Sequence, residues 1–391
     1  MSTEAVIVDV IRTPVGRGKP GGILSGVHPV DLLAGVLDAL VARNDLDPAL
    51  VDDVIGGCVS QIGEQSYNIT RNAVLAAGFP ETVPGTTIDR QCGSSQQAAT
   101  FAAQAVLAGQ ADIVIACGVE SMSRVPLGSS AAGADPYGSR LRTRYPEGLV
   151  NQGVSAELIA AKWGFSREEL DVFAARSHRL AAEAGESGAF ATEVVPVPGV
   201  DALADETVRP GTTVESLAGL NPAFRSDRLA ERFPELDWRI TPGNSSPLTD
   251  GASAALIMSA EAAEHLGLEP RARFRAFSVV GSDPLYMLTG VIPATERVLE
   301  RAGLVHADID AYEVNEAFAS VPLAWLRETG ADAAKLNPRG GAIALGHALG
   351  SSGTRLLTTL VNQLEATGGR LGLQTMCEGG GMANATIIER I

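Results

Sequence analysis

Cys92 is the first residue whose type and position could do chemistry. It lies in Asp89-Arg-Gln-Cys92-Gly-Ser-Ser, where a predicted strand passes into a predicted helix, and the free N–H groups and macrodipole of a helix N-terminus favour an anion. Beside a cation, such a position can lower a thiol pKa from about 8.5 to between about 3.5 and 7.5. Cysteine is also a common small core residue, so this segment alone leaves both a nucleophile and an inert thiol open.

His347 lies in a glycine-rich segment, Arg339-Gly-Gly-Ala-Ile-Ala-Leu-Gly-His347, just before a predicted helix. Glycines at this density allow positive φ angles and close backbone approach, which suits the presentation of an imidazole to a cleft. The segment has neither a GKS or GKT sequence nor an opening GxGxxG, so it does not predict a phosphate-binding loop. As an isolated histidine, His347 could equally be a structural residue.

Two further segments place polar groups at strand ends. Cys377 is followed by Glu378 and three glycines, the first of them Gly379, and the N–H groups of such a turn can converge on one oxyanion. The same pattern is compatible with a tight turn beside an inert thiol. Asn315, in Glu313-Val-Asn315-Glu-Ala, lies at a strand-to-helix junction, where asparagine most often caps a helix.

The composition limits the class of protein. The chain has 391 residues, 45% of them hydrophobic, and a formal net charge of −16, so we expect a globular protein that repels nucleic acid. No apolar run reaches the roughly 20 residues of a membrane helix, and no basic, apolar leader precedes the first strand, so we expect a cytoplasmic protein with no membrane partner. The four cysteines have neither metal-ligand nor disulfide-framework spacing, and no metal site is expected.

Short β-branched runs alternate with longer apolar-periodic segments, which predicts an α/β fold. In the first third of the chain the predicted strands are 5–9, 54–59, 86–89 and 112–117, and the predicted helices are 29–43, 68–77 and 94–108. A strand at 252–259 leads into a second series that opens at 271–280, with helices at 293–302, 318–328 and 351–366 and strands at 309–314, 371–376 and 386–388.

Between these two series the pattern changes. Gly, Ser, Arg and Pro clusters surround one helical stretch at 154–184, which we interpret as part of an inserted, ligand-facing segment. The predicted organisation is an N-terminal half of residues 1–120 and 248–270, an inserted loop domain of residues 121–247, and a C-terminal half of residues 271–391.

The second half mirrors the first. Cys58 lies 34 residues before Cys92 of Cys-Gly-Ser-Ser, and Asn315 lies 34 residues before Leu349 of Leu-Gly-Ser-Ser. The next predicted strand-ending cysteines, Cys117 and Cys377, follow 25 and 28 residues later. The spacing favours a duplicated unit. The two Gly-Ser-Ser helix starts would then face each other about a pseudo-twofold axis.

Taken together, these segments resemble the thiolase family, the acyl-CoA acetyltransferases that cleave or form the bond next to a 3-oxoacyl thioester. The resemblance runs nearly end to end and includes the blocks Gly118-Val-Glu-Ser-Met-Ser-Arg124, Thr241-Pro-Gly-Asn-Ser-Ser246 and Asp250-Gly-Ala. It implies an α/β fold of duplicated βαβαβαββ halves in five α-β-α-β-α layers, with an inserted loop domain.

The resemblance also implies a role for each candidate. Cys92 would carry the acyl group and His347 would take its proton and help to hold the thioester oxygen. Cys377 would be the acid and base for the acetyl carbon or the CoA sulfur, and Asn315 would fix a water in one oxyanion hole. The N–H groups of Cys92 and Gly379 would form the other hole.

The family pattern implies coenzyme A (CoA) and 3-oxoacyl-CoA as substrates, with no separate cofactor. Arg209 and Ser216 lie in a segment that looks like the family's nucleotide contact, and Gly243, Ser246 and Met287 match positions along its pantetheine tunnel. A solvated loop arginine is the competing interpretation of Arg209. Related chains imply a homodimer or homotetramer built on the strand before the nucleophile helix.

Three departures from the family pattern and one closer resemblance within the family bear on the substrate and the site. Ala348 stands where most members have proline, and Asn151-Gln152 stands where biosynthetic acetoacetyl-CoA thiolases have His-Met. The segment 61–68 resembles degradative actinobacterial members, including ones that act on steroid side chains, which favours a bulkier 3-oxoacyl group. Glu378 is more acidic than the usual neighbour of Cys377, and its carboxylate would raise the pKa of that thiol.

Other functions make different demands on the same residues. A ketoacyl-synthase-like enzyme needs a second catalytic histidine where Asn315 stands, and a cysteine hydrolase needs no Cys377. A non-catalytic acyl-CoA or sterol-binding relative would have lost at least one of the four catalytic residues. We therefore expect a thiolase that shortens 3-oxoacyl-CoA in fatty-acid or steroid side-chain β-oxidation, with the acetoacetyl-CoA enzyme as an alternative.

Overall fold

The computed structural model describes residues 4–391; residues 1–3 of the predicted N-terminal half lie outside the described residues. The strands form one sheet in the order β4-β3-β5-β6-β1-β7-β10-β9-β8, with the short β2 paired to β6. The strands are β1 (Ala5–Arg12), β2 (Gly16–Arg17), β3 (Asp53–Gly57), β4 (Gly85–Ile88), β5 (Ile113–Ser121), β6 (Thr249–Ser259), β7 (Ala272–Gly281), β8 (Ala311–Val314), β9 (Leu371–Glu378) and β10 (Met382–Arg390).

Two half-sheets make up this sheet. In the first, β3 runs parallel to β4 and β5, and in the second β8 runs parallel to β9, while the other long strands pair antiparallel. The halves meet at β1 and β7 through two residue pairs, Val6↔Arg273 and Ile7↔Ala272. Each half-sheet has its own apolar core on its outer face, and the two share a third core between them.

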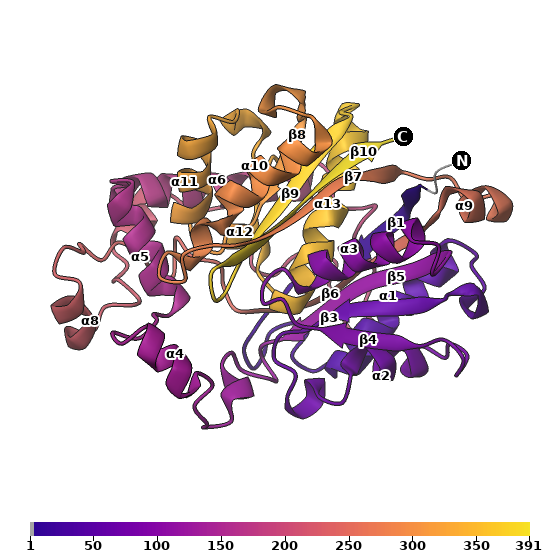
Figure 1. Ribbon diagram of the computed structural model, residues 1–391, viewed down its shortest axis with the longest axis horizontal. Coiled ribbons are helices and arrows are strands. Elements are labelled where there is room, and N and C mark those ends of the chain that lie inside the picture. The colour runs from indigo at the N-terminus through magenta and orange to yellow at the C-terminus, as the bar shows by residue number, and fades with distance from the viewer. Residues whose placement is uncertain (1–3) are drawn as a thin grey trace.

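Helices form three layers around the two half-sheets (Figure 1). The outer helices are α1 (Pro29–Arg43) and α2 (Ile69–Ala76) on the first half and α10 (Val291–Ala302) and α11 (Ser320–Thr329) on the second, and the central helices are α3 (Ser94–Leu107) and α13 (Ser352–Thr367). Two shorter helices are α9 (Ala260–Leu266), after β6, and α12 (Ala342–Leu345), before His347. The five-layer α/β arrangement expected from the resemblance is confirmed.

The central layer requires small residues. The buried face of α3 carries Ala98, Ala99, Ala102 and Ala103, all within the shared core. Helix α13 crosses α3 so closely that a Cβ on Gly353 would lie 2.0 Å from the backbone nitrogen of Gln96. The two helices therefore hold a fixed separation, because no larger side chain fits at their crossing.

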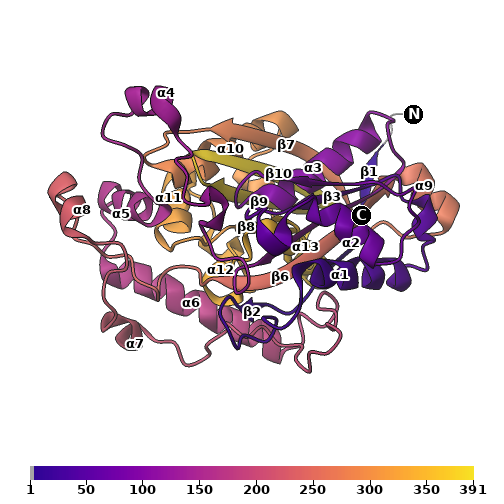
Figure 2. The same cartoon turned by 90° about the horizontal axis from the view of Figure 1, so that it is seen from below.

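The segment between β5 and β6 contributes no strand to the sheet within the described residues. Figure 2 shows its helices to one side of the sheet, and they are α4 (Gly138–Arg144), α5 (Gln152–Lys162), α6 (Arg167–Glu186), α7 (Val214–Ala218) and α8 (Asp227–Arg232). The expectation of one helical stretch at 154–184 is wrong in one respect, since the segment forms two helices, α5 and α6, with a break between them. Gly164, with φ +68°, ends α5, and a capping box between Ser166 and Glu169 begins α6.

The sheet register corrects one detail of the predicted duplication. The pairs Asp53↔Val114 and Ala311↔Gly372 occupy the same place in the two halves, and Asp52 and Asp310 make matching hydrogen bonds beside them. On this register Cys117 corresponds to Thr375 and not to Cys377, because β5 continues beyond the cysteine to Ser121. The same register makes Glu120 the counterpart of Glu378.

The crossing of α3 and α13 gives a first prediction. Gly353→Ala should lower the free energy of unfolding by about 1–3 kcal/mol, because the added methyl group must push the two helices apart. Urea unfolding followed by circular dichroism measures the loss. Gly185→Ala in α6 is the matched control: nothing lies within 4 Å of its Cβ position, and alanine there should gain up to about 0.5–1 kcal/mol. Equal effects at the two positions would contradict the proposed close packing.

Candidate active site

Cys92 lies at the amino end of α3, one residue before the Gly93 N-cap. The turn that delivers it is strained, since Gln91 has a φ of +49°, a value uncommon for residues other than glycine. The Cys92 side chain is 1% exposed, and Gln152 Nε2 approaches its Sγ at 4.0 Å. The thiol is therefore enclosed in protein and faces an amide donor from α5.

His347 lies in the turn between α12 and α13, behind Gly346, whose φ is +80°. Its Nδ1 lies 2.6 Å from the Ser352 hydroxyl oxygen, and that hydroxyl donates to the Ala348 carbonyl at 2.8 Å. Because the serine hydrogen is used in this second bond, Nδ1–H donates to Ser352 Oγ. The Nε2 atom of the neutral ring therefore carries no hydrogen and presents a lone pair.

Asn315 joins this histidine to the second thiol. It follows β8 directly, and its Nδ2 lies 3.5 Å from His347 Nε2 and 3.9 Å from Cys377 Sγ. Cys377 is close enough to Cys92 that its thiolate charge would raise the pKa of Cys92. The structure therefore brings together the four residues predicted to be catalytic, two from strands β8 and β9 and two from helix starts.

Burial controls the protonation of the site. It raises the pKa of Cys92 well above its ordinary value and that of Cys377 to about 12, while it lowers the pKa of His347 to about 3. The expectation that the helix N-terminus lowers the pKa of Cys92 is wrong for the free protein, because desolvation outweighs the helix macrodipole. At neutral pH the site holds two thiols and an uncharged imidazole. The predicted effect of Glu378 is in the expected direction, since its charge raises the pKa of Cys377.

Gly379 follows β9 and is buried beneath two amide side chains. A Cβ at this position would lie 3.0 Å from Gln91 Oε1 and 3.2 Å from Gln152 Nε2. Because glycine has no Cβ, the backbone after Cys377 can pack against these two amides. One of them, Gln152, also contacts Cys92.

The predicted CoA-contacting residues fall into an inner and an outer group. In the inner group, Ser246 donates its backbone N–H to the Ala317 carbonyl, two residues after Asn315, at 3.0 Å. Met287 is buried in a short 3-10 helix, 287–290, that contacts β9, β10 and α5. Gly243 is buried beside α7, where a Cβ would meet Leu217.

Arg209 and Ser216 form the outer group and are not brought to the thiols. Both are exposed. The Ser216 hydroxyl completes a capping box with Thr213 at the start of α7, and the Arg209 backbone N–H donates to His178 Nδ1 at 3.2 Å. The structure thus gives Ser216 a local structural function.

Two residues at the site, Ser352 and Glu316, were missed by the sequence analysis, which named Gln152 only for its bearing on the substrate. Ser352 sets the His347 tautomer, Gln152 faces Cys92, and buried Glu316 links the Asn315 loop to the His347 loop by accepting from Asn337 Nδ2 and the Ile343 N–H. The repeated Gly-Ser-Ser motif and the Asn315-Glu316 dipeptide were the signals that could have identified Ser352 and Glu316.

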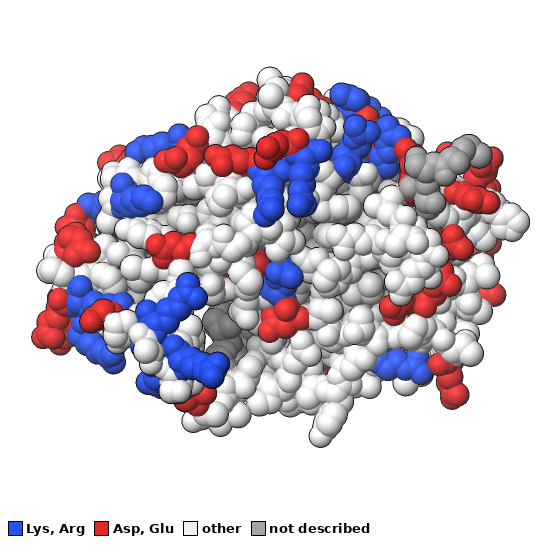
Figure 3. All heavy atoms as spheres, in the orientation of Figure 1, with Lys and Arg blue, Asp and Glu red and all other residues white. Residues whose placement is uncertain are grey.

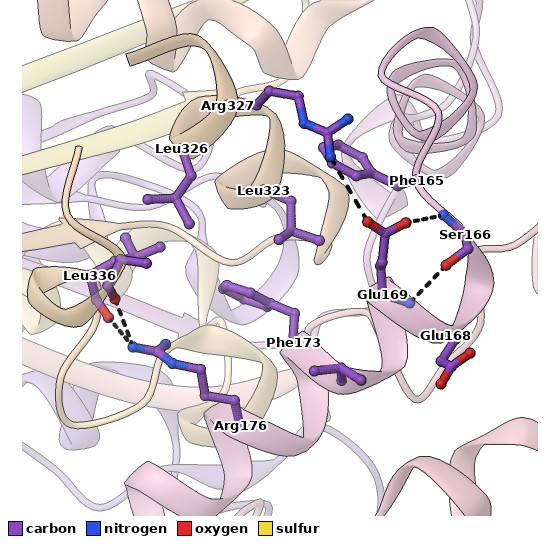
Figure 4. Close-up of a pocket in the computed structure, with 12 residues that line it drawn as sticks. Phe165, Ser166, Glu168, Glu169, Phe173, Arg176, Leu323, Leu326, Arg327 and Leu336 are labelled. Atoms are coloured by element: carbon purple, nitrogen blue, oxygen red, sulfur yellow. Dashed lines mark hydrogen bonds and ion pairs between the residues drawn. The ribbon is translucent and has the colours of Figure 1, made fainter. Parts of the chain in front are cut away.

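A separate pocket of about 570 Å³ lies between α6 and α11 (Figure 4). Phe165, Phe173 and Leu323 line its apolar part, while Glu169 and Arg327 pair at its edge. None of the predicted catalytic or CoA-contacting residues lines it.

Among residues 4–391 there is no group of His, Cys, Asp or Glu side chains placed to hold a metal, and none of the helices is both long enough and apolar enough to cross a membrane. All four cysteines are free and buried. The chain is thus an α/β protein whose two halves meet at a buried pair of thiols and an uncharged histidine, the groups used in covalent acyl transfer.

Comparison with known proteins agrees with this class. The family model for the thiolase N-terminal domain matches residues 5–261, and that for the thiolase C-terminal domain matches residues 268–390. The chain therefore belongs to the thiolase family, whose members are acyltransferases.

Individual relatives match over nearly their whole length. A steroid 3-ketoacyl-CoA thiolase of Mycobacterium tuberculosis, FadA6, is 48% identical over 100% of this chain and 95% of its own. A 3-ketoacyl-CoA thiolase of Erwinia tasmaniensis is 46% identical over 99% and 100%. The crystal structure of the Bacillus anthracis acetyl-CoA acetyltransferase superposes with a TM-score of 0.88 at 38% identity, over 100% of this chain and 99% of that one.

Ala348 gives a second prediction. Its φ is −70°, the value that proline prefers, its N–H makes no backbone hydrogen bond in the described part of the chain, and a small cavity of about 10 Å³ adjoins it. Ala348→Pro should therefore raise the free energy of unfolding by about 0.4–1 kcal/mol through the unfolded state. Urea unfolding measures this gain. A loss of stability would show that the loop at His347 cannot accept the proline ring.

Proposed function

We propose that this protein is an acyl-CoA C-acetyltransferase that cleaves 3-oxoacyl-CoA with CoA to acetyl-CoA and a shortened acyl-CoA. The observation that carries the proposal is the convergence of Cys92, Asn315, His347 and Cys377 in a chain of the thiolase family. The directions of the pKa shifts favour a neutral imidazole and two protonated thiols, the forms from which the proposed reaction starts.

The first half of the reaction transfers the acyl group to Cys92. As Cys92 Sγ bonds to the 3-oxo carbon, its proton moves to the free Nε2 of His347, which the lowered pKa keeps uncharged beforehand. The bond between C2 and C3 then breaks, and its electron pair forms the enolate of acetyl-CoA. The Cys377 thiol protonates C2 of this enolate, which leaves a Cys377 thiolate and an acyl group on Cys92.

The second half returns both thiols to their starting state. The Cys377 thiolate takes the proton of CoA, and the CoA sulfur attacks the acyl carbon on Cys92. His347 gives its proton back to the Cys92 sulfur as it leaves. In this proposal the N–H groups of Cys92 and Gly379 hold the oxygen of the 3-oxo group, which becomes the carbonyl oxygen of the acyl-Cys92 thioester. His347 and a water oriented by Asn315 hold the oxygen of the CoA thioester, which becomes the enolate oxygen.

We assign CoA to a path that runs from the outer to the inner group of contact residues. Met287, Ser246 and Gly243 would line the pantetheine arm, and Ser216 and Arg209 would lie near the nucleotide. Despite the net charge of −16, the surface also carries local positive charge: Figure 3 shows Lys and Arg side chains over the region of α4 and α8. The exposed arginines of these two segments are Arg140, Arg142, Arg144, Arg225 and Arg228. Such a local potential attracts a polyanionic substrate.

For the acyl group we favour a bulky 3-oxoacyl chain, such as a steroid side chain. The relative with 48% identity bears the name steroid 3-ketoacyl-CoA thiolase, and Asn151-Gln152 replaces the His-Met pair of acetoacetyl-specific enzymes. The reaction would belong to β-oxidation in the cytoplasm, with CoA as a substrate and no other cofactor.

We further propose a homodimer, or a homotetramer made of two dimers. The observation that favours it is β4, which is the last strand at its end of the sheet and pairs with β3 alone within the described residues. An edge strand with one open side readily pairs with a second copy, and β4 directly precedes Cys92.

Intact-protein mass spectrometry tests the proposed reaction. After exposure to a panel of 3-oxoacyl-CoA esters, including acetoacetyl-CoA and a steroid side-chain ester, the protein should gain the mass of the substrate acyl group shortened by two carbons and release acetyl-CoA. Cys92→Ala should gain nothing, while Cys117→Ala, which removes an equally buried thiol, should behave like the unmodified protein. The size of the adduct identifies the preferred substrate.

Two results would contradict the proposal. An adduct that persists in Cys92→Ala would assign the nucleophile elsewhere. Binding of the CoA esters without any adduct or acetyl-CoA release would instead identify a non-catalytic acyl-CoA-binding relative.

A further inference from the structure

Glu120 and Glu378 occupy equivalent places in the two halves, but their surroundings differ completely. The Glu120 carboxylate accepts hydrogen bonds from the N–H groups of Val59, Ser60 and Gly350 and from Gln65 Nε2, all between 2.8 and 3.0 Å. One of these donors, Gly350, opens the Gly-Ser-Ser segment at the start of α13. Glu120 is therefore a fully bonded structural carboxylate.

Glu378 reaches the equivalent glycine at the start of α3 and finds no such donors. A Cβ on Gly93 would lie 2.1 Å from Glu378 Oε1, so the carboxyl group lies against the residue that follows Cys92. The side chain is 0% exposed, and neither oxygen has a hydrogen-bond partner. The neighbouring Asn384 donates from Nδ2 to the Gly93 carbonyl, and no hydrogen bond joins it to Glu378.

The charged and titratable groups that act on this carboxyl group come from two elements. Arg90 and Asp89, in the turn before α3, lower and raise its pKa respectively, and no ion pair joins Arg90 to it. The thiols of Cys92 and Cys377 are the other titratable groups, and a negative charge on Glu378 raises the pKa of both.

A buried carboxylate without hydrogen bonds is unfavourable, and the group responds by remaining protonated. Burial accordingly raises the pKa of Glu378 to about 8. At neutral pH the carboxyl group is mostly uncharged. In mildly alkaline solution it places a negative charge against Gly93, the residue after Cys92, and this like charge raises the pKa of Cys92 and opposes formation of its thiolate.

We propose that Glu378 is a positioning residue that controls the ionisation of Cys92: its uncharged carboxyl group permits the thiolate, and its charged form suppresses it. The proposal rests on the proposed function only in taking Cys92 as the nucleophile. As a consequence, the rate at which Cys92 is acylated should stop rising with pH once Glu378 becomes charged. Ionisation of Cys92 and His347 alone would not produce this effect.

The experiment follows the alkylation of Cys92 by iodoacetamide between pH 6 and pH 10, with peptide-resolved mass spectrometry and no CoA ester present. In the unmodified protein the rate should rise with pH and then flatten near pH 8, as Glu378 becomes charged. Glu378→Gln should react within about twofold of the unmodified protein at pH 7 and about fivefold faster at pH 9. A change of one pKa unit alters the thiolate fraction about tenfold, and at pH 9 about one tenth of Glu378 is still uncharged.

Glu378→Asp is the control that keeps a titratable group, and it should retain the flattening. Parallel curves for Glu378→Gln and the unmodified protein, or a change of equal size at pH 7 and pH 9, would overturn the proposal in favour of a packing role. Thermal unfolding shows whether each variant is folded. If Glu378→Gln does not fold, the alkylation curve of Glu378→Asp decides: a rate that flattens with pH supports the proposal, and a rate that does not flatten overturns it.

Failure of this proposal is distinguishable from failure of the proposed function. The alkylation rate reports the ionisation of Cys92 in the absence of any substrate, whereas the acyl adduct reports the reaction. If the protein forms the adduct but the alkylation curves are parallel, the proposed thiolase function stands and only the proposed role of Glu378 is wrong.

Discussion

The crossing of α3 and α13 is the contact on which the rest of the structure depends. Gly353 brings the two helix backbones together where a Cβ would lie 2.0 Å from the nitrogen of Gln96, so their amino ends also lie close. Cys92 precedes one of these ends and His347 the other, and β8 and β9 add Asn315 and Cys377 from the second half-sheet. A site divided among four distant segments is held in place because the amino-terminal halves of both helices, which carry the site, are buried.

Burial explains the chemistry as well as the geometry. In a dry site the uncharged forms of thiol and imidazole are favoured, so no ion is present until the substrate arrives. The Ser352 hydroxyl directs the His347 proton to Nδ1 and leaves Nε2 as the base. The duplicated halves have diverged at their equivalent carboxyl groups: Glu120 accepts from backbone N–H groups of both halves and joins them, whereas Glu378 has no hydrogen bond and lies against the residue after the nucleophile.

Local patterns in the sequence predicted the fold class and the duplication. Each of the four central residues remained open on its own motif, and only the resemblance of the ordered motifs to the thiolase family selected them together. The break between α5 and α6 also had a local signal, in Gly164 and the Ser166 to Glu169 capping box, which the apolar periodicity across it concealed. The raised pKa of Cys92 had none, since desolvation depends on distant side chains. The correspondence of Cys117 with Thr375 likewise required the strand register.

Cross-linking of the two thiols tests most directly whether the two halves build one site. 1,3-Dichloroacetone joins two thiols through a three-carbon bridge and therefore reacts twice only where sulfur atoms are close. In the native protein the account predicts one bridge between Cys92 and Cys377, found as a linked peptide pair within one chain and absent after unfolding in urea. Separate single adducts on Cys92 and Cys377, or a bridge from either to Cys58 or Cys117, would contradict it.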